Sequence, residues 1–231
     1  TIVAAASDQI VGTANSGGDW QILSKPLPRS FAFAAADDGT AYARVTNGGV
    51  KTSPDAISWT DRPGFVSQSL KYFGSENILY AVNVTGTFIR STDQGATNTL
   101  VGTVPGALEG IRGYPSSLTC SSDGVKVAFV AGGLGVYFSE DAGVTWRLFV
   151  SDDDATWAHV SMSGDGSLVL IAAEGAPAKV MLSSDGGFTW VLQTGLPDFE
   201  WADTSISKDG STIVLTSLDD PSGVWRKTLA V

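Results

Sequence analysis

Cysteine and histidine are almost absent from this chain. Its 231 residues include one cysteine, Cys120, and one histidine, His159. A single cysteine cannot form an internal disulfide, and this one lies in an apolar strand pattern, so we expect a small buried side chain. A single histidine excludes a metal site built from several histidines, and a Ser-His-Asp triad would depend on His159 alone. We expect His159 to be a packed, hydrogen-bonded residue.

Long apolar runs and helical periodicity are also missing. The sequence contains no stretch of eighteen apolar residues and no recognisable signal peptide, so we expect no direct insertion into a membrane. No glycine-rich phosphate loop is followed by a helix, and no nucleophile-elbow sequence is present. These absences leave few classes of catalytic site open.

Positive charge is scarce. The chain has 14 lysine and arginine residues against 24 aspartate and glutamate residues, which gives a formal net charge of −10. Nucleic acids and anionic membranes are polyanions, so an acidic surface disfavours both as direct partners. The same surface allows bound cations.

A turn-like motif recurs along the chain. Residues 183–190 read S-x-D-x-G-x-T-W, residues 139–146 have the same pattern, and residues 91–98 match except at the last position. Residues 13–20 and 52–59 are degenerate copies that match the motif at fewer positions. The last residues of the five copies are 39, 39, 48 and 44 positions apart. Repeats of this length indicate an array of one supersecondary unit.

A second turn signal has the same period. Asp-Gly pairs, which favour tight hairpins, begin at Asp123, Asp165 and Asp209, 42 and 44 residues apart. Period-2 alternation in short segments predicts strands throughout. The second unit, for example, predicts strands at Phe31–Ala35 and Thr40–Thr46, with the intervening Asp38-Gly39 as their turn.

We therefore predict an all-β fold, a six-bladed β-propeller formed by residues 1–231 as a single domain. The first unit lacks its innermost strand and the last lacks its outermost, so five blades plus a tail is the alternative. Because the chain begins with Thr1 inside a strand pattern, we expect it to be the C-terminal part of a longer chain. In the repeated motif, Asp and Ser would bond backbone N–H groups, and Trp would pack against the adjacent blade.

The repeated motif resembles the Asp boxes of β-propellers found in sialidases, sortilin-like receptors and many secreted or viral heads. In these families the boxes are structural. The turn-rich, degenerate repeats and the size of the chain are also similar in character to receptor-binding heads of bacteriophage spikes, including those of the membrane-containing marine corticoviruses. That resemblance implies a virion-surface or extracellular location, attachment to a bacterial receptor or glycan, and contacts with other virion proteins through an N-terminal region.

Loops that join one blade to the next carry the candidate ligand-binding residues, since function in such scaffolds usually lies on loops. Trp157 and Trp201 stand 44 residues apart at one phase of the repeat, which favours packing between blades over stacking on a sugar. Trp225 lies outside the box positions and is predicted to be core. The candidate ligand-binding residues are Arg62, Glu109, Arg112, Tyr114, Trp157 and Trp201.

Acidic clusters in the same loops are candidate calcium ligands, because Ca²⁺ binds several carboxylate and carbonyl oxygens. No cluster has EF-hand spacing, and solvated acidic loops that aid solubility are the alternative. The candidate metal ligands are Asp152, Asp153, Asp154, Asp198, Glu200, Asp219 and Asp220.

A sialidase-like glycoside hydrolase is the leading enzyme hypothesis. Such enzymes use an arginine triad, a Tyr–Glu pair and an Arg-Ile-Pro-type motif, and here only Pro28-Arg29-Ser30 is vaguely similar. We therefore predict no catalytic residues and a non-enzymatic attachment head, with calcium as an expected cofactor. A lectin-like module or an assembly propeller is a further alternative.

Overall fold

The computed structural model consists of β-strands joined by turns and loops. Its described residues fall into two compact units, residues 1–103 and 104–231, and each is treated by itself. No helix in this part of the chain has the length and apolar character needed to cross a bilayer. The structure describes residues 2–5, 10–13, 18–24, 30–36, 40–46, 49–64, 69–73, 78–83, 86–104, 115–131, 135–149, 155–175, 179–219 and 223–229.

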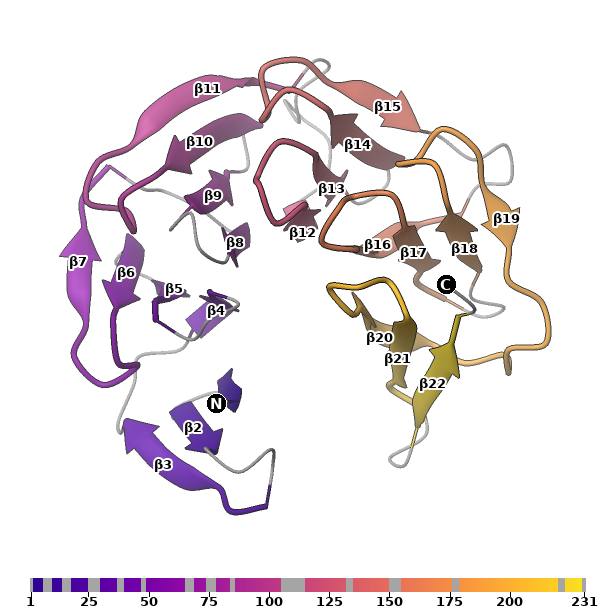
Figure 1. Ribbon diagram of the computed structural model, residues 1–231, viewed down its shortest axis with the longest axis horizontal. Helices are drawn as coiled ribbons and strands as arrows, with labels where there is room; N and C mark the ends of the chain where they lie inside the picture. Colours follow the sequence, from indigo (N-terminus) through magenta and orange to yellow (C-terminus); the bar gives the residue numbers. More distant parts are fainter. Residues whose placement is uncertain are drawn as a thin grey trace. The chain divides into compact units, whose positions relative to one another are not determined.

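Three antiparallel sheets make up the first unit (Figure 1). The first sheet has three strands and the other two have four, each in chain order. The strands are β1 (Ile2–Ala5), β2 (Ile10–Thr13) and β3 (Gln21–Ser24); β4 (Ser30–Ala35), β5 (Tyr42–Thr46), β6 (Gly49–Ser53) and β7 (Thr60–Arg62); and β8 (Ser69–Phe73), β9 (Ile78–Val82), β10 (Thr87–Ser91) and β11 (Thr99–Thr103).

Three further sheets make up the second unit, and Figure 1 shows them side by side in chain order. The last of them has three strands. The strands are β12 (Pro115–Cys120), β13 (Val127–Ala131), β14 (Gly135–Ser139) and β15 (Arg147–Phe149); β16 (Trp157–Met162), β17 (Val169–Ala173), β18 (Val180–Ser183) and β19 (Val191–Leu192); and β20 (Trp201–Ile206), β21 (Thr212–Ser217) and β22 (Val224–Thr228).

The prediction of an all-β propeller is confirmed. Strands β4 to β22 form five blade-like sheets, and β1–β3 form an additional N-terminal sheet. The two three-stranded sheets are the ones that the sequence predicted to be incomplete. Cys120 is buried, as predicted. The predicted Asp38-Gly39 turn lies outside the described residues.

Each well-preserved Asp box joins the third and fourth strands of its sheet. In the box after β18, the Ser183 hydroxyl donates to Asp185 Oδ1 and accepts the Gly187 backbone N–H, both at 2.8 Å. Asp185 Oδ1 accepts the Thr189 backbone N–H at 2.8 Å, and Asp185 Oδ2 accepts the Thr189 hydroxyl at 2.6 Å. The boxes after β10 and β14 repeat this network. The predicted structural role of the box residues is therefore confirmed.

The Asp-Gly turns join the first and second strands of the sheets in the second unit, and they connect neighbouring sheets. The Ser122 N–H donates to the Gly164 carbonyl at 2.7 Å, and the Gly164 N–H donates to the Lys208 carbonyl at 2.8 Å. A Cβ at Gly164 would lie 2.8 Å from that Lys208 oxygen, which only glycine avoids. In the sheet of β16–β19, the Gly186 N–H in the box also donates to the Ser167 carbonyl beside the Asp-Gly turn, at 2.9 Å. Box turns and Asp-Gly turns therefore lie at the same end of these sheets.

Replacing Ser183 with alanine should destabilise the protein by about 1–3 kcal/mol, because the buried Gly187 N–H would lose its acceptor. Chemical unfolding in urea, followed by circular dichroism, measures the effect. The adjacent Ser184 is exposed, and Ser184→Ala is the matched control with an expected change of about 0.5 kcal/mol or less. Equal effects of the two substitutions would contradict a structural role for the box hydroxyl.

Candidate functional site

A cavity of about 310 Å³ opens between the last two sheets of the second unit. It is lined by Val180 of β18, by residues 193–196 after β19, and by residues of β21 and β22. Ile213 and Leu215 form its buried wall, at 4% and 2% exposure. This volume is at the lower end of the range for ligand pockets.

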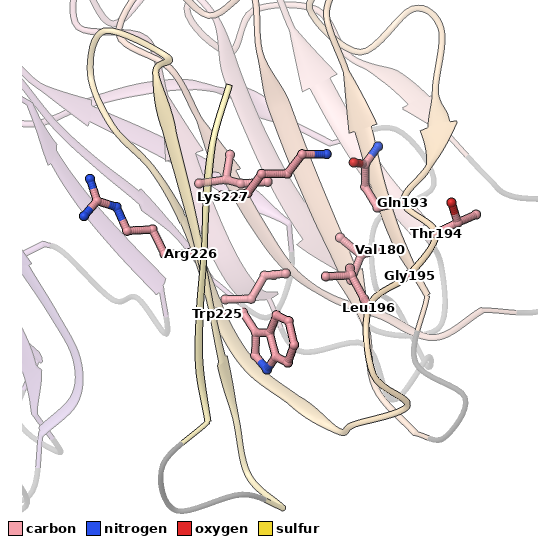
Figure 2. A pocket seen from close by; sticks show the side chains of 10 residues that line it. Val180, Gln193, Thr194, Gly195, Leu196, Trp225, Arg226 and Lys227 are labelled. Carbon is pink, nitrogen blue, oxygen red and sulfur yellow. The ribbon is translucent and has the colours of Figure 1, made fainter. Parts of the chain in front are cut away.

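Side chains of β22 alternate between the cavity and the opposite face of the sheet. Figure 2 shows Trp225 and Lys227 directed toward Val180, Gln193 and Leu196, whereas Arg226 points away. Trp225 pairs with Leu215, and Lys227 pairs with Ile213, so these side chains continue the apolar face of β21. The cavity thus offers an aromatic ring, aliphatic side chains, an amide and an ammonium group, and no carboxylate is among the described residues that line it.

The position of Trp225 corrects the sequence prediction that it is core. Its side chain is 41% exposed, because β22 is the last strand of its sheet among the described residues. In the four-stranded sheets the third strand is covered on both sides by neighbours, whereas β22 has β21 alone. The strand pattern predicts which face a side chain takes, but not whether another strand covers it.

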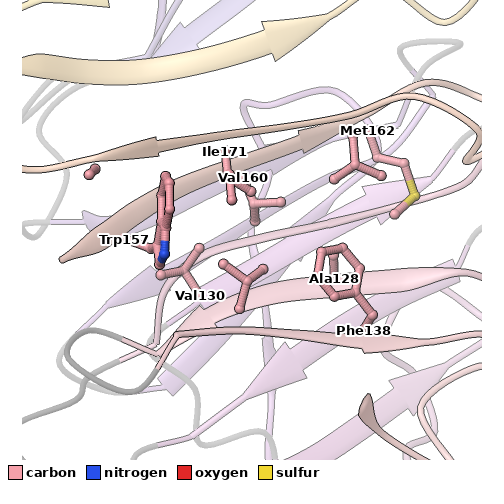
Figure 3. Packing of buried hydrophobic residues seen from close by; sticks show 10 residues of the cluster. Ala128, Val130, Phe138, Trp157, Val160, Met162 and Ile171 are labelled. Carbon is pink, nitrogen blue, oxygen red and sulfur yellow. The ribbon is translucent and has the colours of Figure 1, made fainter. Parts of the chain in front are cut away.

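Trp157 and Trp201, two of the predicted ligand-binding residues, lie in the core. They are 2% and 0% exposed. Figure 3 shows Trp157 beside Val130, between the sheets of β12–β15 and β16–β19. Trp201 belongs to the equivalent cluster between the last two sheets. Both rings are enclosed by packed side chains, so neither presents a face that a ligand could reach in this conformation.

The remaining predicted ligand-binding residues are not brought together in the described structure. Arg62 is half-buried in β7, and its Nε donates to Thr52 Oγ1 of the same sheet at 2.6 Å. Glu109, Arg112 and Tyr114 lie outside the described residues.

Two of the predicted acidic clusters meet at the start of β20. Asp219 Oδ2 accepts the Glu200 backbone N–H at 2.8 Å, and the Leu218 N–H donates to the Glu200 carbonyl at 2.9 Å. Asp198 is exposed nearby in sequence. Within the part of the chain that the structure describes, no group of three or more His, Cys, Asp or Glu residues is arranged to hold a metal. The predicted ligands Asp152, Asp153, Asp154 and Asp220 lie outside that part.

The carboxyl groups with strongly lowered pKa values lie in the turns and not in the cavity. Hydrogen bonds from the Thr189 hydroxyl and backbone N–H lower the pKa of Asp185 to about 2. The Ser163 hydroxyl and the Ser167 N–H do the same for Asp165, whose pKa is also about 2. These groups remain ionised at neutral pH and stabilise the turns by accepting hydrogen bonds. Their role is therefore structural.

The predicted environment of His159 is a packed strand, and the structure places it in β16 with a partly buried side chain. Its Nδ1 lies 3.9 Å from Asp203 Oδ1 on β20. The pair joins two neighbouring sheets, and no serine hydroxyl is hydrogen-bonded to this imidazole in the described network.

Sequence reasoning did not identify the cavity. Two signals for it were nevertheless present: the last unit lacked an outermost strand, and Trp225 lay outside the box positions. An aromatic residue in a third strand without a fourth strand beside it is a candidate for exposure.

Comparison with known proteins supports the fold. No protein-family model and no curated protein sequence matches the chain. Among solved structures, an ancestral GH74 enzyme superimposes with a TM-score of 0.74 and 17% identity over 96% of this chain. The GH74 xyloglucanase from Xanthomonas campestris gives a TM-score of 0.71 with 13% identity over 96% of the chain. A GH74 enzyme from Niastella koreensis gives 0.69 with 14% identity over 91%.

These similarities concern architecture. The chain spans 34%, 41% and 38% of the lengths of those three proteins. At such identities the likeness shows that the chain is built like the propeller domains of GH74 enzymes, and fold does not determine function.

Proposed function

We propose that this protein is a non-enzymatic attachment head that binds a ligand on a cell surface through the cavity beside β22. The observation that carries the proposal is the lining of that cavity: Trp225, Leu196 and Lys227 can supply apolar contact, stacking and one charge, and the described residues that line it include no carboxylate. Hydrolysis of a glycosidic bond ordinarily needs two carboxyl groups flanking it. The lining therefore supports binding without hydrolysis.

The scaffold suits such a role, because turn networks hold the sheets in place around the cavity. In this proposal the sheet of β1–β3 is the sixth blade. Ligand binding by Arg62, Glu109, Arg112 and Tyr114 remains a prediction from the sequence. Calcium held by the acidic loops, including Asp198, Glu200 and Asp219, remains a sequence prediction. A location on a viral spike that attaches to bacteria is likewise a prediction from the sequence.

Binding of the fluorescently labelled protein to a panel of intact marine and enteric bacteria tests the proposal. We expect saturable binding to a few strains and a loss of at least tenfold in affinity on Trp225→Ala, as for an exposed aromatic anchor at an interface. Trp20, which precedes β3, is 47% exposed, so Trp20→Ala is the matched control and should bind as the unmodified protein does. Equal binding by both variants would remove the cavity from the proposal, and binding to no strain would overturn attachment itself. Repeating the assay with a chelator tests the calcium prediction.

A glycoside hydrolase is the second candidate, favoured by the structural similarity to GH74 enzymes, one of which is a xyloglucanase. In that case carboxylates of the acidic loops would supply the acid and base. Incubation with xyloglucan and with a fluorogenic sialoside, followed by detection of released products, separates the two candidates. Turnover of either substrate would overturn the non-enzymatic proposal.

A further inference from the structure

One buried positive charge in the first unit has no hydrogen-bond partner. Arg44 lies in the middle of β5 and is 4% exposed. Its Nε and Nη1 atoms are buried, and neither forms a hydrogen bond. Among the described residues, no carboxylate lies within ion-pair distance of its guanidinium group. A charge taken out of water without a partner is strongly unfavourable, so such a group ordinarily pairs with an opposite charge.

The fold does not require a charge at this position. In the other four-stranded sheets, the equivalent residue lies two positions after the partner of the box serine in the second strand. These equivalent residues are Ala81, Phe129 and Ile171. All three are apolar and 0% exposed. An arginine in the same core position therefore needs an explanation other than packing.

The surroundings of Arg44 are largely apolar. Tyr42, which lies two residues earlier and on the same side of β5, packs with Ile10 of β2. The ring of Trp59 covers the guanidinium, with 4.3 Å from Arg44 Cζ to the ring centroid. Attraction between a cation and an aromatic ring is favourable. It leaves the buried Nε and Nη1 without an acceptor, so it compensates the charge only in part.

A second positive charge stands directly opposite the first. Arg44 pairs with Lys51 of β6, so both side chains project from one face of the sheet. Like charges directly opposite each other on a sheet are destabilising. Lys51 forms an ion pair with Asp61 of β7, whose side chain is 72% exposed. The cross-strand row Arg44-Lys51-Asp61 thus carries two positive charges and one negative charge, and its buried end is positive.

Loss of a proton does not remove this charge at neutral pH. Burial lowers the pKa of Arg44, and the charge of Asp61 raises it. The ordinary pKa of an arginine is so high that the group stays protonated in proteins. A bound anion can compensate the charge that Trp59 and Asp61 leave.

We propose that a small inorganic anion of about the size of chloride binds Arg44 between the sheet of β1–β3 and the sheet of β4–β7. The anion accepts hydrogen bonds from the buried guanidinium N–H groups and neutralises the positive end of the cross-strand row. The low exposure of Arg44 favours a single monatomic ion over phosphate or an acidic sugar. The site belongs to the first unit and the cavity to the second, so this inference does not depend on the proposed attachment function.

A purely structural interpretation of Arg44 makes the opposite prediction. Under it, the contact with Trp59 and the long-range attraction of Asp61 hold the guanidinium without any bound ion. Chloride would then affect the unmodified protein and a variant without Arg44 in the same way. Comparing the two proteins therefore decides between the interpretations, because general salt effects are common to both.

The test is urea unfolding of the whole protein as chloride replaces gluconate at constant ionic strength. An anion that binds only the folded state should raise the equilibrium constant for folding, by about threefold or more at about 100 mM chloride. Arg44→Met removes the charge, keeps an unbranched side chain, and should abolish this dependence. Lys208 is exposed in the second unit, so Lys208→Met is the matched control and should retain it. No dependence in the unmodified protein, or the same dependence in Arg44→Met, would overturn the inference.

A direct location of the ion keeps the inference testable even if Arg44→Met does not fold. Bromide resembles chloride and is visible by anomalous X-ray diffraction. Crystals of the unmodified protein soaked in sodium bromide should show an anomalous peak at hydrogen-bond distance from the Arg44 guanidinium. Bromide should also replace chloride in the unfolding experiment, whereas the larger sulfate should not. Absence of a peak beside Arg44, or an equal stabilisation by sulfate that also depends on Arg44, would overturn a monatomic anion site.

Discussion

Replacing Trp201 with alanine is expected to lower the free energy of unfolding by about 3–5 kcal/mol, the usual cost of removing a large core aromatic. The Trp201 side chain is 0% exposed and packs in the cluster between the last two sheets. It also meets Phe199 edge-on, with 6.0 Å between ring centroids. A loss of this size is a large fraction of the stability of an ordinary domain.

Urea unfolding of Trp201→Ala beside Trp20→Ala measures this effect. Trp20 is 47% exposed, so its substitution should cost about 0.5 kcal/mol or less. If Trp201→Ala does not fold, Trp201→Phe keeps part of the buried surface and should cost about 1–3 kcal/mol. Similar values for positions 201 and 20 would contradict the buried placement of Trp201.

Acidification should destabilise the protein strongly between about pH 4 and pH 2. Hydrogen bonds to the ionised carboxyl groups of the turns lower their folded-state pKa values below 3.8, their ordinary value. A group with a depressed folded pKa contributes stability above its unfolded pKa, and that contribution is lost as the pH falls through the folded pKa. The aspartates whose pKa falls to about 2 are Asp55, Asp93, Asp165, Asp185 and Asp209.

The urea midpoint measured at intervals from pH 7 to pH 2 checks this prediction. We expect little change down to about pH 5 and a steep fall below pH 4. A triple variant with asparagine at Asp93, Asp141 and Asp185 loses titrating groups in three boxes, so its midpoint should depend less steeply on pH. A flat profile for the unmodified protein between pH 4 and pH 2 would contradict the turn hydrogen bonds.

Local signals predicted the strands and turns well, because the chemistry of a box is contained within eight residues. The Ser183 hydroxyl and Asp185 carboxylate bond groups at most four residues away, so no distant partner is needed to form the turn. The same holds for the turn at Asp165, whose Oδ1 accepts the Ser167 N–H at 3.0 Å. Repetition of these turns made the propeller fold predictable.

The candidate site was predictable only in part. The missing outermost strand could be counted from the sequence, but the exposure of Trp225 could not. Trp201 and Trp225 both occur in strand patterns, yet one is enclosed by two sheets and the other lies at an edge. The difference depends on neighbouring strands and not on the residues adjacent in sequence.

By itself, the sequence determined the all-β class, the repeat, the positions of the turns and the ionised aspartates within them, because those features arise from hydrogen bonds between near neighbours. Only the tertiary structure decided which aromatic side chains are buried, where Asp219 meets Glu200, and where a cavity opens beside β22. Burial and cavities depend on which sheets face each other and which strand lacks a neighbour, and those relations join residues far apart in the chain.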